Sequence, residues 1–440
     1  MTLRPSQPRP LPSLDGSSYY AATAHPRPAA AELQGDATAE VAVVGGGIAG
    51  LCAALELARQ GAQVTLLESG RIGCGASGRN GGQALGDFAC GIEALERRLG
   101  AAAAQQAWQC AQQALHRLRQ RIAEHAIDCD WRNGALTVAA DARQAAALQA
   151  AMRHRQQVYG ATHLRWLEAA ELRQHVASSR YRGGVLDPMA GHLHPLNYTL
   201  GLARAARRLG VTVHEGSQVL QLHGEGGRHV LRCAGGRLRA ARLLLATGAV
   251  PGAPLARLRA RVLPVASCML ATEALREPVV PREVAVCDSA FIPDYYRQSA
   301  DGRLLFGSGA HHAGAMLHDG AERRRRLRSA MLRVFPQLQD TAITHDWGGW
   351  IDVSVNRAPD FGRVGAAGVY LQGFSGHGLA LAGLAGELGA RALLGGPGSC
   401  PEFELFARLP HAALPTRGWL RVPVGMLGSL WGRLQHTVGG

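Results

Sequence analysis

The chain has 440 residues, 47% of them hydrophobic, and a formal net charge of +14 at pH 7. This length can bury a large core and predicts two domains, or one domain with a large insertion. No apolar run approaches about 18 residues, so we expect no transmembrane segment. The nine cysteines show neither C-x-x-C pairs nor a Cys/His spacing suited to zinc. We therefore expect no metal site, and reduced thiols in a cytoplasmic protein.

All 47 basic residues are arginine, and the chain contains no lysine. Such a complete replacement indicates a compositional bias rather than a surface built to bind nucleic acid. The densest run, Arg323 to Arg326, shares an expected helix with Glu322 and is typical of a solvated helical face. We therefore expect no nucleic-acid partner, although the net charge leaves open a non-enzymatic protein associated with RNA or a membrane.

Residues 1–38 form a proline-rich leader that lacks the apolar segment of a signal peptide. The next residues, 41–44, are a continuous apolar run that predicts a buried parallel strand. Gly45, Gly47 and Gly50 follow with the G-x-G-x-x-G spacing. These glycines permit a tight turn, a close approach of the backbone to a pyrophosphate and close packing of helix on strand.

A helix over residues 48–60 and a second strand over residues 63–67 follow the glycine finger. The helix would direct its first N–H groups and its positive dipole end at the phosphates. Glu68 ends the second strand, where a carboxylate can accept hydrogen bonds from both ribose hydroxyls. The order strand, glycine turn, helix, strand and acid predicts a dinucleotide site.

The rest of the chain alternates helical and extended patterns after a Gly/Ser-rich loop at 73–82. The predicted helices cover 91–124, 141–158, 191–210, 319–334 and 379–394. The predicted strands cover 131–139, 211–213, 218–222, 241–249, 262–272, 295–298, 303–307 and a last one near 370. The tail includes an apolar stretch at 424–434, which predicts a docked C-terminal helix and leaves a peripheral membrane contact open.

The strands that look dinucleotide-related, near 41, 63, 219, 243 and 369, are separated by other material. The predicted fold class is therefore α/β, or α+β overall, with a discontinuous Rossmann-like domain and a mixed-sheet substrate domain. We expect the binding domain to comprise 39–90, 190–260 and 341–396. The substrate domain would comprise 91–189 and 261–340, and the tail 397–440.

Three features favour FAD over NAD as the dinucleotide. The chain has one complete finger, near its N-terminus, and a later apolar strand that ends in Ala246-Thr247-Gly248. The glycine-rich segment 373–378 opens a late helix whose N–H groups can face a second part of a long cofactor. When flavin N5 accepts a hydride, negative charge develops around N1 and the C2 carbonyl, and a helix N-terminus stabilises that charge.

Several motifs occur in one order along the chain: the finger, GASGRNGGQ at 75–83, LATGA at 245–249, WGGWID at 347–352, NRAPDFGRV at 356–364 and GFSGHG at 373–378. Together they resemble the D-amino-acid-oxidase-like flavoprotein superfamily. Within it, the chain is most similar to the γ-glutamylputrescine oxidoreductase group, which SYY at 18–20 and GHLHPLNY at 191–198 also fit. The resemblance covers residues 18–435.

The resemblance implies that FAD is held by residues from four parts of the chain. The pyrophosphate, adenosine and ring contacts would come from Gly45, Gly47, Ile48, Ala49, Gly50, Glu68, Ser69, Arg71, Ser77, Asn80, Gly81, Gly82, Gln83, Val219, Thr247, Gly248, Gly376, His377, Gly378 and Leu379. Some relatives attach FAD through a cysteine near the late glycine element, but no cysteine lies between Cys287 and Cys400. We therefore expect non-covalent FAD.

The resemblance implies oxidative deamination, in which a neutral amine loses hydride from its α-carbon to N5 and the imine hydrolyses to an aldehyde. The preferred substrate is γ-glutamylputrescine or a related polyamine derivative. The alternative is an amino-acid or N-methyl-amino-acid oxidase or dehydrogenase. Some relatives use a lysine above the ring to help oxygen reoxidise the flavin. Because this chain has no lysine, both oxygen and another electron acceptor stay open.

The catalytic residues stay unassigned, and the substrate-pocket candidates are aromatic or basic. Tyr295 and Tyr296 could form an aromatic wall, although adjacent strand residues point to opposite faces and at most one would face the ring. Arg297 could pair with a substrate carboxylate. For Trp347 and Trp350, as for both tyrosines, core packing is favoured over a pocket role. For His192 and His194, we expect loop histidines whose hydrogen bonds are satisfied within the protein, rather than an acid–base pair.

Overall fold

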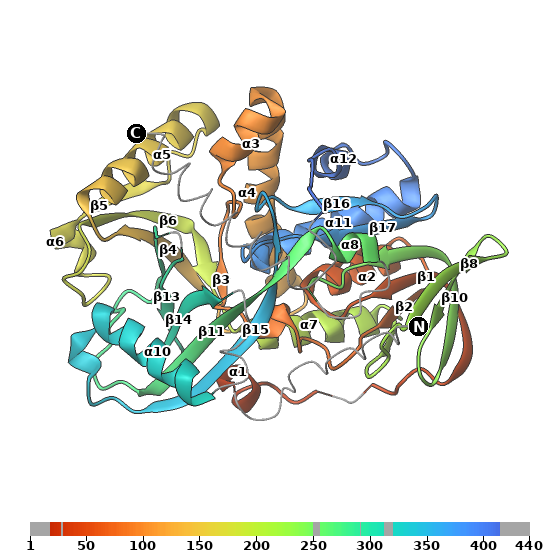
Figure 1. Ribbon diagram of the computed structural model, residues 1–440, viewed down its shortest axis with the longest axis horizontal. Helices are drawn as coiled ribbons and strands as arrows, with labels where there is room; N and C mark the ends of the chain where they lie inside the picture. The colour runs from red at the N-terminus through yellow and green to blue at the C-terminus, as the bar shows by residue number, and fades with distance from the viewer. Residues whose placement is uncertain (1–17, 28–29, 250–255, 291, 312–319, 414–440) are drawn as a thin grey trace, which may run out of the picture.

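The computed structural model describes residues 18–27, 30–249, 256–290, 292–311 and 320–413. Two mixed sheets and the helices around them make up this part of the chain (Figure 1). The leader up to residue 17 and the apolar stretch at 424–434 lie outside the described residues.

The first sheet holds the predicted glycine finger. Its parallel centre is β10, β1, β2 and β7, and it continues through β17 to an antiparallel edge, β16. A β8–β9 hairpin extends from β10. The strands are β1 (Gly35–Val44), β2 (Val64–Leu67), β7 (Thr212–His214), β8 (Gln221–Glu225), β9 (Arg228–Arg232), β10 (Gly236–Leu245), β16 (Asp360–Arg363) and β17 (Gly368–Gln372).

The second sheet runs in the order β15-β11-β14-β13-β12-β4-β6-β3, with β5 beside β6. In Figure 1 it lies on the left, and the first sheet lies on the right. Its strands are β3 (Gln83–Ala84), β4 (Arg132–Ala139), β5 (Arg165–Glu168), β6 (Gly183–His192), β11 (Val262–Ala274), β12 (Ala285–Asp288), β13 (Tyr295–Gln298), β14 (Arg303–His311) and β15 (Ile343–Ser354).

Helices cover both sheets, and α11 packs against α2 and α4 in the interior. The helices are α1 (Tyr19–Ala22), α2 (Ile48–Arg59), α3 (Ile92–Leu99), α4 (Ala101–Glu124), α5 (Ala142–Tyr159), α6 (Ala169–Leu172), α7 (Pro195–Arg208), α8 (Ala256–Arg259), α10 (Gly320–Val334), α11 (Gly378–Gly395) and α12 (Pro401–Ala407). Short 3₁₀ turns lie at Ala76–Gly78 and Pro336–Leu338.

The predicted fold class is confirmed, and three element predictions need correction. The helix expected over 91–124 is two helices, because Gly100 has φ +81° and ends α3 where α4 begins. The strand expected near 219 begins only at Gln221 and pairs with β9, so β7 is the neighbour of β2. The tail forms α12, a helix that the sequence patterns did not predict.

Sheet membership also bears on the expected domains. β15 belongs to the second sheet, although its residues fall in the 341–396 range expected for the dinucleotide-binding domain. β6 spans the expected boundary between 189 and 190. The domain division itself stays a prediction.

Helix α11 is long and apolar enough to cross a membrane by length and composition, yet 78% of it is buried inside the structure. A buried ion pair holds it to α4, since Arg121 donates from Nη2 to Glu387 Oε1 over 2.6 Å. Arg117 donates to the same carboxylate. Burial favours the protonated form of Glu387, but these two arginines lower its pKa overall. The pair therefore positions α11 as an interior helix.

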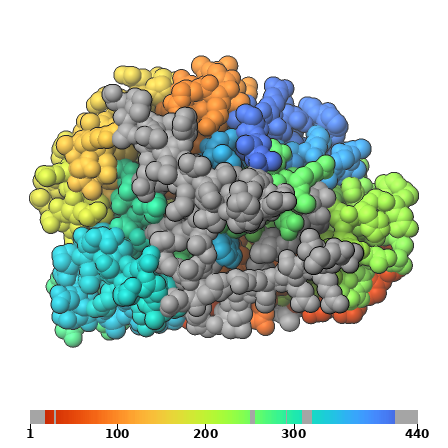
Figure 2. All heavy atoms as spheres, in the orientation of Figure 1, coloured from red at the N-terminus to blue at the C-terminus, as the bar shows by residue number. Residues whose placement is uncertain are grey.

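The arginine run on α10 makes ion pairs with nearby acids. Arg323 and Arg324 pair with Asp346 of β15, and Arg325 and Arg326 pair with Glu322 one turn earlier on the helix. Figure 2 shows α10 at one end of the visible face and the β8–β9 hairpin at the other. Part of the local positive charge is therefore neutralised within the fold.

Candidate active site

The glycine finger lies where β1, β2 and β10 reach the same edge of the first sheet. Val44 pairs with Leu67 and with Leu245, so the turn at Gly45 meets the segment that follows β10. Gly45 has φ +114°, and a Cβ there would lie 2.4 Å from the Ala246 carbonyl oxygen. A Cβ at Gly50 would lie 2.0 Å from the Gly45 carbonyl oxygen. Backbone packs directly on backbone at this edge, which only glycine allows.

Glu68 lies beside this turn with its carboxylate fixed by backbone donors. The Gly46 N–H donates to Oε2 over 2.6 Å, and the Gly70 N–H donates to Oε1 over 2.8 Å. The Ser69 hydroxyl also donates to Oε1. The carboxylate thus sits at the finger, where the ribose of a dinucleotide would lie. Nearby, Val219 is buried against β1 and β2, whereas Arg71 is exposed.

The loop from Gly75 to Gln83 joins the finger to the second sheet. The first N–H of α2, at Ile48, donates to Ser77 Oγ over 2.9 Å. Asn80 donates to the Ser77 carbonyl and accepts from the Gly82 N–H. Gln83 then donates to the Val286 carbonyl of β12 over 2.9 Å. A ligand that starts at α2 can therefore follow this loop to the inner face of the second sheet.

The late glycine turn brings a second helix N-terminus toward the second sheet. Gly376 has φ +92°, and a Cβ there would lie 3.8 Å from Ile351 Cδ1 of β15. Asp352 accepts the Gly373 N–H over 2.6 Å, and burial raises its pKa to about 6. His377 is the N-cap residue of α11, and its Nδ1 has no hydrogen-bond partner in the described chain. Burial lowers the pKa of His377 to about 4, so its ring is neutral at pH 7.

These features fit FAD. The finger is a cradle that any Cβ would fill, and a carboxylate stands beside it for a ribose. The N-terminus of α2 suits a pyrophosphate, and the N-terminus of α11, with its unpartnered His377 nitrogen, suits the polar edge of a flavin. Thr247 and Gly248 lie after β10 next to the finger, and Gly378 and Leu379 open α11.

The two predicted tyrosines lie on opposite faces of β13. Tyr295 faces the cofactor loop, since a Cβ on Gly81 would lie 2.9 Å from its ring, and its hydroxyl lies 2.8 Å from Ser267 Oγ. Tyr296 faces the other way, where it donates to Tyr181 and stacks on Phe306 with ring centroids 5.7 Å apart. Tyr295 is therefore the pocket candidate of the pair, and Tyr296 is a core residue.

Arg297, expected to meet a substrate carboxylate, is buried and makes its hydrogen bonds within the protein. Its side chain is 2% exposed and donates to the Gly81 carbonyl over 3.0 Å and to the Tyr20 hydroxyl over 3.2 Å. Arg297 thereby ties the cofactor loop to the leader. Tyr20 is fully buried, so the part of the leader around α1 belongs to the structural core.

Trp347 is also a core residue rather than part of the pocket border. It is 1% exposed, packs edge-on against Tyr20 and donates from Nε1 to the Arg79 carbonyl over 3.0 Å. Trp350 is half-buried on the next part of β15. On the same face of β15 as Trp347, Gly349 lies against Arg79 and Ile351 lies near Gly376.

The two histidines act as structural residues. His194 caps α7 by accepting the Asn197 N–H at Nδ1, and its Nε2 lies 3.0 Å from Thr23 Oγ1. His192 Nε2 contacts the Glu283 carbonyl. Burial and the charge of Arg297 lower both pKa values to about 3. Both rings are neutral at pH 7, so neither serves there as a general acid.

Two arginines near the site were missing from the predicted set. Arg79 lies in the cofactor loop, 7% exposed, and donates from Nε to the Gly348 carbonyl over 2.6 Å. Arg357 has φ +58° and acts electrostatically on Cys90, Cys287 and His377. Both lie within the quoted motifs, GASGRNGGQ and NRAPDFGRV. The motifs marked the segments, but only the fold shows where these side chains lie.

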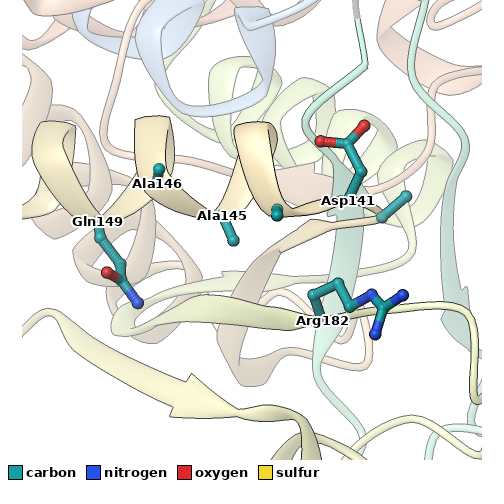
Figure 3. Close-up of a pocket in the computed structure, with 7 residues that line it drawn as sticks. Asp141, Ala145, Ala146, Gln149 and Arg182 are labelled. Atoms are coloured by element: carbon teal, nitrogen blue, oxygen red, sulfur yellow. The ribbon is translucent and has the colours of Figure 1, made fainter.

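A separate surface depression lies at the start of α5. Figure 3 shows Asp141, Ala145, Ala146 and Gln149 along α5 and its N-cap, with Arg182 from the segment before β6. It is open, and no predicted site residue lines it. We assign it no role in the reaction.

Comparisons with known proteins agree with this site. Residues 40–392 match the family described as FAD dependent oxidoreductase. The chain is 38% identical to the γ-glutamylputrescine oxidoreductase of Escherichia coli over 96% of this chain and 99% of that one. It is 38% identical to the probable oxidoreductase OrdL of Haemophilus influenzae over 83% of this chain and 85% of that one.

Solved structures confirm the fold. L-proline dehydrogenase from P. horikoshii superposes with a TM-score of 0.72 at 20% identity, over 86% of this chain and 98% of that one. Glycine oxidase from Geobacillus kaustophilus superposes with a TM-score of 0.69 at 21% identity, over 82% of this chain and 95% of that one. The family uses FAD, typically without a covalent bond, for oxidative deamination. The predicted family and cofactor are confirmed: this chain belongs to the FAD-dependent oxidoreductase family related to D-amino-acid oxidase.

Proposed function

We propose that this chain deaminates the terminal amine of a γ-glutamyl polyamine derivative, with γ-glutamylputrescine as the first candidate. The observation that carries the proposal is the 38% identity with the E. coli enzyme over nearly both full lengths. On this proposal the enzyme acts in polyamine catabolism. All nine cysteines are free thiols, which supports a cytoplasmic location.

The residues of the site fit oxidation of an uncharged amine. Bound FAD supplies the acceptor for the hydride that leaves the amine's α-carbon, and water then converts the imine to an aldehyde and ammonia. The N-terminus of α11 stabilises negative charge at the cofactor's polar edge. Asp352 holds the turn at Gly373 that aims this helix end. The Tyr295 ring, against Gly81, excludes water from one side of the site.

Arg357 is the residue that we assign to the glutamyl carboxylate. Arg357 lies in the loop after β15, and its charge acts on His377 at the N-terminus of α11 and on Cys287 of β12. Its φ of +58° is rare for a residue other than glycine, and such strain concentrates at ligand sites. An arginine can bind a carboxylate through two parallel hydrogen bonds.

A second candidate is oxidation of an amino acid or N-methyl amino acid. It is favoured by 29% identity with the glycine oxidase of Geobacillus kaustophilus over 51% of this chain and 57% of that one. Arg357 would suit the carboxylate of such a substrate as well. The two candidates differ in the distance between the carboxylate and the reacting amine.

Reduction of an artificial electron acceptor during turnover of γ-glutamylputrescine, putrescine, sarcosine, glycine and proline separates the candidates, because this readout does not depend on which product is released. We expect the highest kcat/KM with γ-glutamylputrescine, and in Arg357→Gln a rise of KM for γ-glutamylputrescine of at least about tenfold, with little change for putrescine, which has no carboxylate. A highest kcat/KM with sarcosine, glycine or proline would reject the first candidate. Stopped-flow reoxidation by oxygen and by a soluble quinone would identify the electron acceptor.

A further inference from the structure

Arg79 is a buried cation in the cofactor loop without a counter-ion in the described part of the chain. Its Nε donates to the Gly348 carbonyl, but its buried Nη1 has no hydrogen-bond partner among the described residues. Burial lowers its pKa, the charge of Arg323 lowers it further, and only the Cys74 and Cys268 thiols act in the other direction. Burial raises the pKa of Cys74 to about 12 and of Cys268 to about 11, so both are uncharged at pH 7.

An unpaired buried charge is unusual, because removing a charge from water without a partner is strongly unfavourable. Arg121 shows the usual solution, since it is equally buried but pairs with Glu387. The difference between these two arginines points to a bound ligand that supplies the negative charge and the hydrogen-bond acceptor that Arg79 lacks among the described residues.

The position of Arg79 indicates which part of a ligand it faces. Its side chain lies against Gly349 of β15, where a Cβ would be 3.4 Å from Arg79 Cβ and 3.8 Å from Nε. Two positions along the same strand, about 7 Å away, Ile351 contacts Gly376 before α11. Arg79 therefore lies beside the strand that leads to the turn before α11, two residues along the cofactor loop from Ser77.

The other basic groups of the site have different contacts. His192, His194 and His377 have pKa values lowered to about 3 or 4, so they are neutral at pH 7. Arg297 donates to the Gly81 carbonyl and the Tyr20 hydroxyl. Arg357 is the residue assigned above to the substrate carboxylate. The chain has no lysine. A fixed positive charge beside the cofactor loop must therefore come from an arginine.

We propose that Arg79 supplies the fixed positive charge that stabilises the reduced, negatively charged flavin ring in this enzyme. It does so as a positioning and electrostatic residue, because two electrons added to the flavin create negative charge that a nearby guanidinium stabilises. The inference rests on the FAD-dependence of the family and is independent of which amine is oxidised.

The test compares the affinity for oxidised and for reduced FAD, measured anaerobically on the full chain. Arg79→Gln and Arg79→Met are expected to weaken binding of reduced FAD at least about tenfold more than binding of oxidised FAD. A tenfold difference corresponds to a midpoint potential about 30 mV lower. Arg79→Lys, which keeps the charge, should restore most of the difference. Arg237→Met, which removes an exposed arginine paired with Asp36 outside the site, is the control and should leave the ratio of the two affinities unchanged.

Three outcomes would overturn the proposal. Equal weakening for both redox states would mean that Arg79 faces the pyrophosphate. No change in either affinity would mean that the charge acts on neither part of the cofactor. Failure of both neutral variants to fold, while Arg79→Lys folds, would show that the protein itself needs the positive charge at position 79, with or without its cofactor.

Discussion

The two ends of the cofactor site are built in different ways. The pyrophosphate end comes mostly from one continuous segment, β1 to β2, where backbone packs so closely on backbone that a Cβ on Gly50 would lie 2.0 Å from the Gly45 carbonyl oxygen. The flavin end is assembled from β11, β13, β15, the 354–358 loop and the turn before α11. One end depends on local chain geometry, and the other depends on the tertiary fold.

The largest expected effect lies at the pyrophosphate end. Gly50→Ala places a methyl group 2.0 Å from the Gly45 carbonyl, so the finger must open. We expect FAD affinity to fall at least about 100-fold, or about 2.7 kcal/mol, in a fluorescence titration of the apo-protein. Gly75→Ala is the control, because its Cβ meets nothing within 4 Å and its φ is −84°. Similar losses in both variants would show that the backbone contact is not the cause.

The second prediction concerns the packing that positions the flavin end. Arg121→Met leaves Glu387 in the interior with Arg117 as its remaining partner. We expect a loss of about 1.5–3 kcal/mol in the free energy of unfolding, measured by urea denaturation, because Arg117 still pairs with the carboxylate. The exposed Arg237–Asp36 pair gives the comparison, and Arg237→Met should leave the unfolding midpoint nearly unchanged. A comparable loss at both positions would contradict the role given to burial.

The third prediction uses pH. His194 has a pKa lowered from 6.5 to about 3, so the unfolded chain binds a proton that the folded chain does not. The stability that this provides is complete above pH 6.5 and falls as the pH drops toward 3, by up to about 1.4 kcal/mol per pH unit. His194→Asn keeps an N-cap residue before α7. Unfolding of this variant should take up one proton fewer at acid pH, so its free energy of unfolding should fall less steeply as the pH drops. An unchanged slope between pH 6.5 and 5 would reject this assignment.

The smallest effect is expected at Tyr295. Tyr295→Phe removes the hydroxyl near Ser267 but keeps the ring against Gly81, so FAD affinity should change less than about threefold. Tyr295→Ala removes the wall and should weaken binding or turnover more. If the Phe variant loses as much FAD affinity or turnover as the Ala variant, the hydroxyl of Tyr295 rather than its ring contributes to the site.

The comparison also explains what the sequence could predict. The finger and Glu68 follow from glycine spacing, helix and strand periodicity and one acid, all within 28 residues of chain, 41 to 68. The family and FAD were predicted from motifs in order and are confirmed. These features depend on the local backbone, which the sequence encodes directly.

The flavin end could be predicted only in part. Adjacent positions on β13 gave the opposite faces of Tyr295 and Tyr296, but nothing local shows that Arg297 turns toward Tyr20 of the leader, 277 positions away. Arg79 and Arg357 were overlooked for the same reason, because their neighbours come from β11, β12 and β15. Burial and long-range contacts decide these roles.

Anaerobic mixing of the FAD-loaded enzyme with γ-glutamylputrescine tests the proposed function most directly. The account predicts that the visible absorbance of the bound flavin bleaches and that one ammonia is released per flavin. Gly50→Ala, purified alongside, should show little bound flavin to bleach. Persistent flavin absorbance with γ-glutamylputrescine and with every other amine of the panel, in protein that binds FAD, would contradict the account.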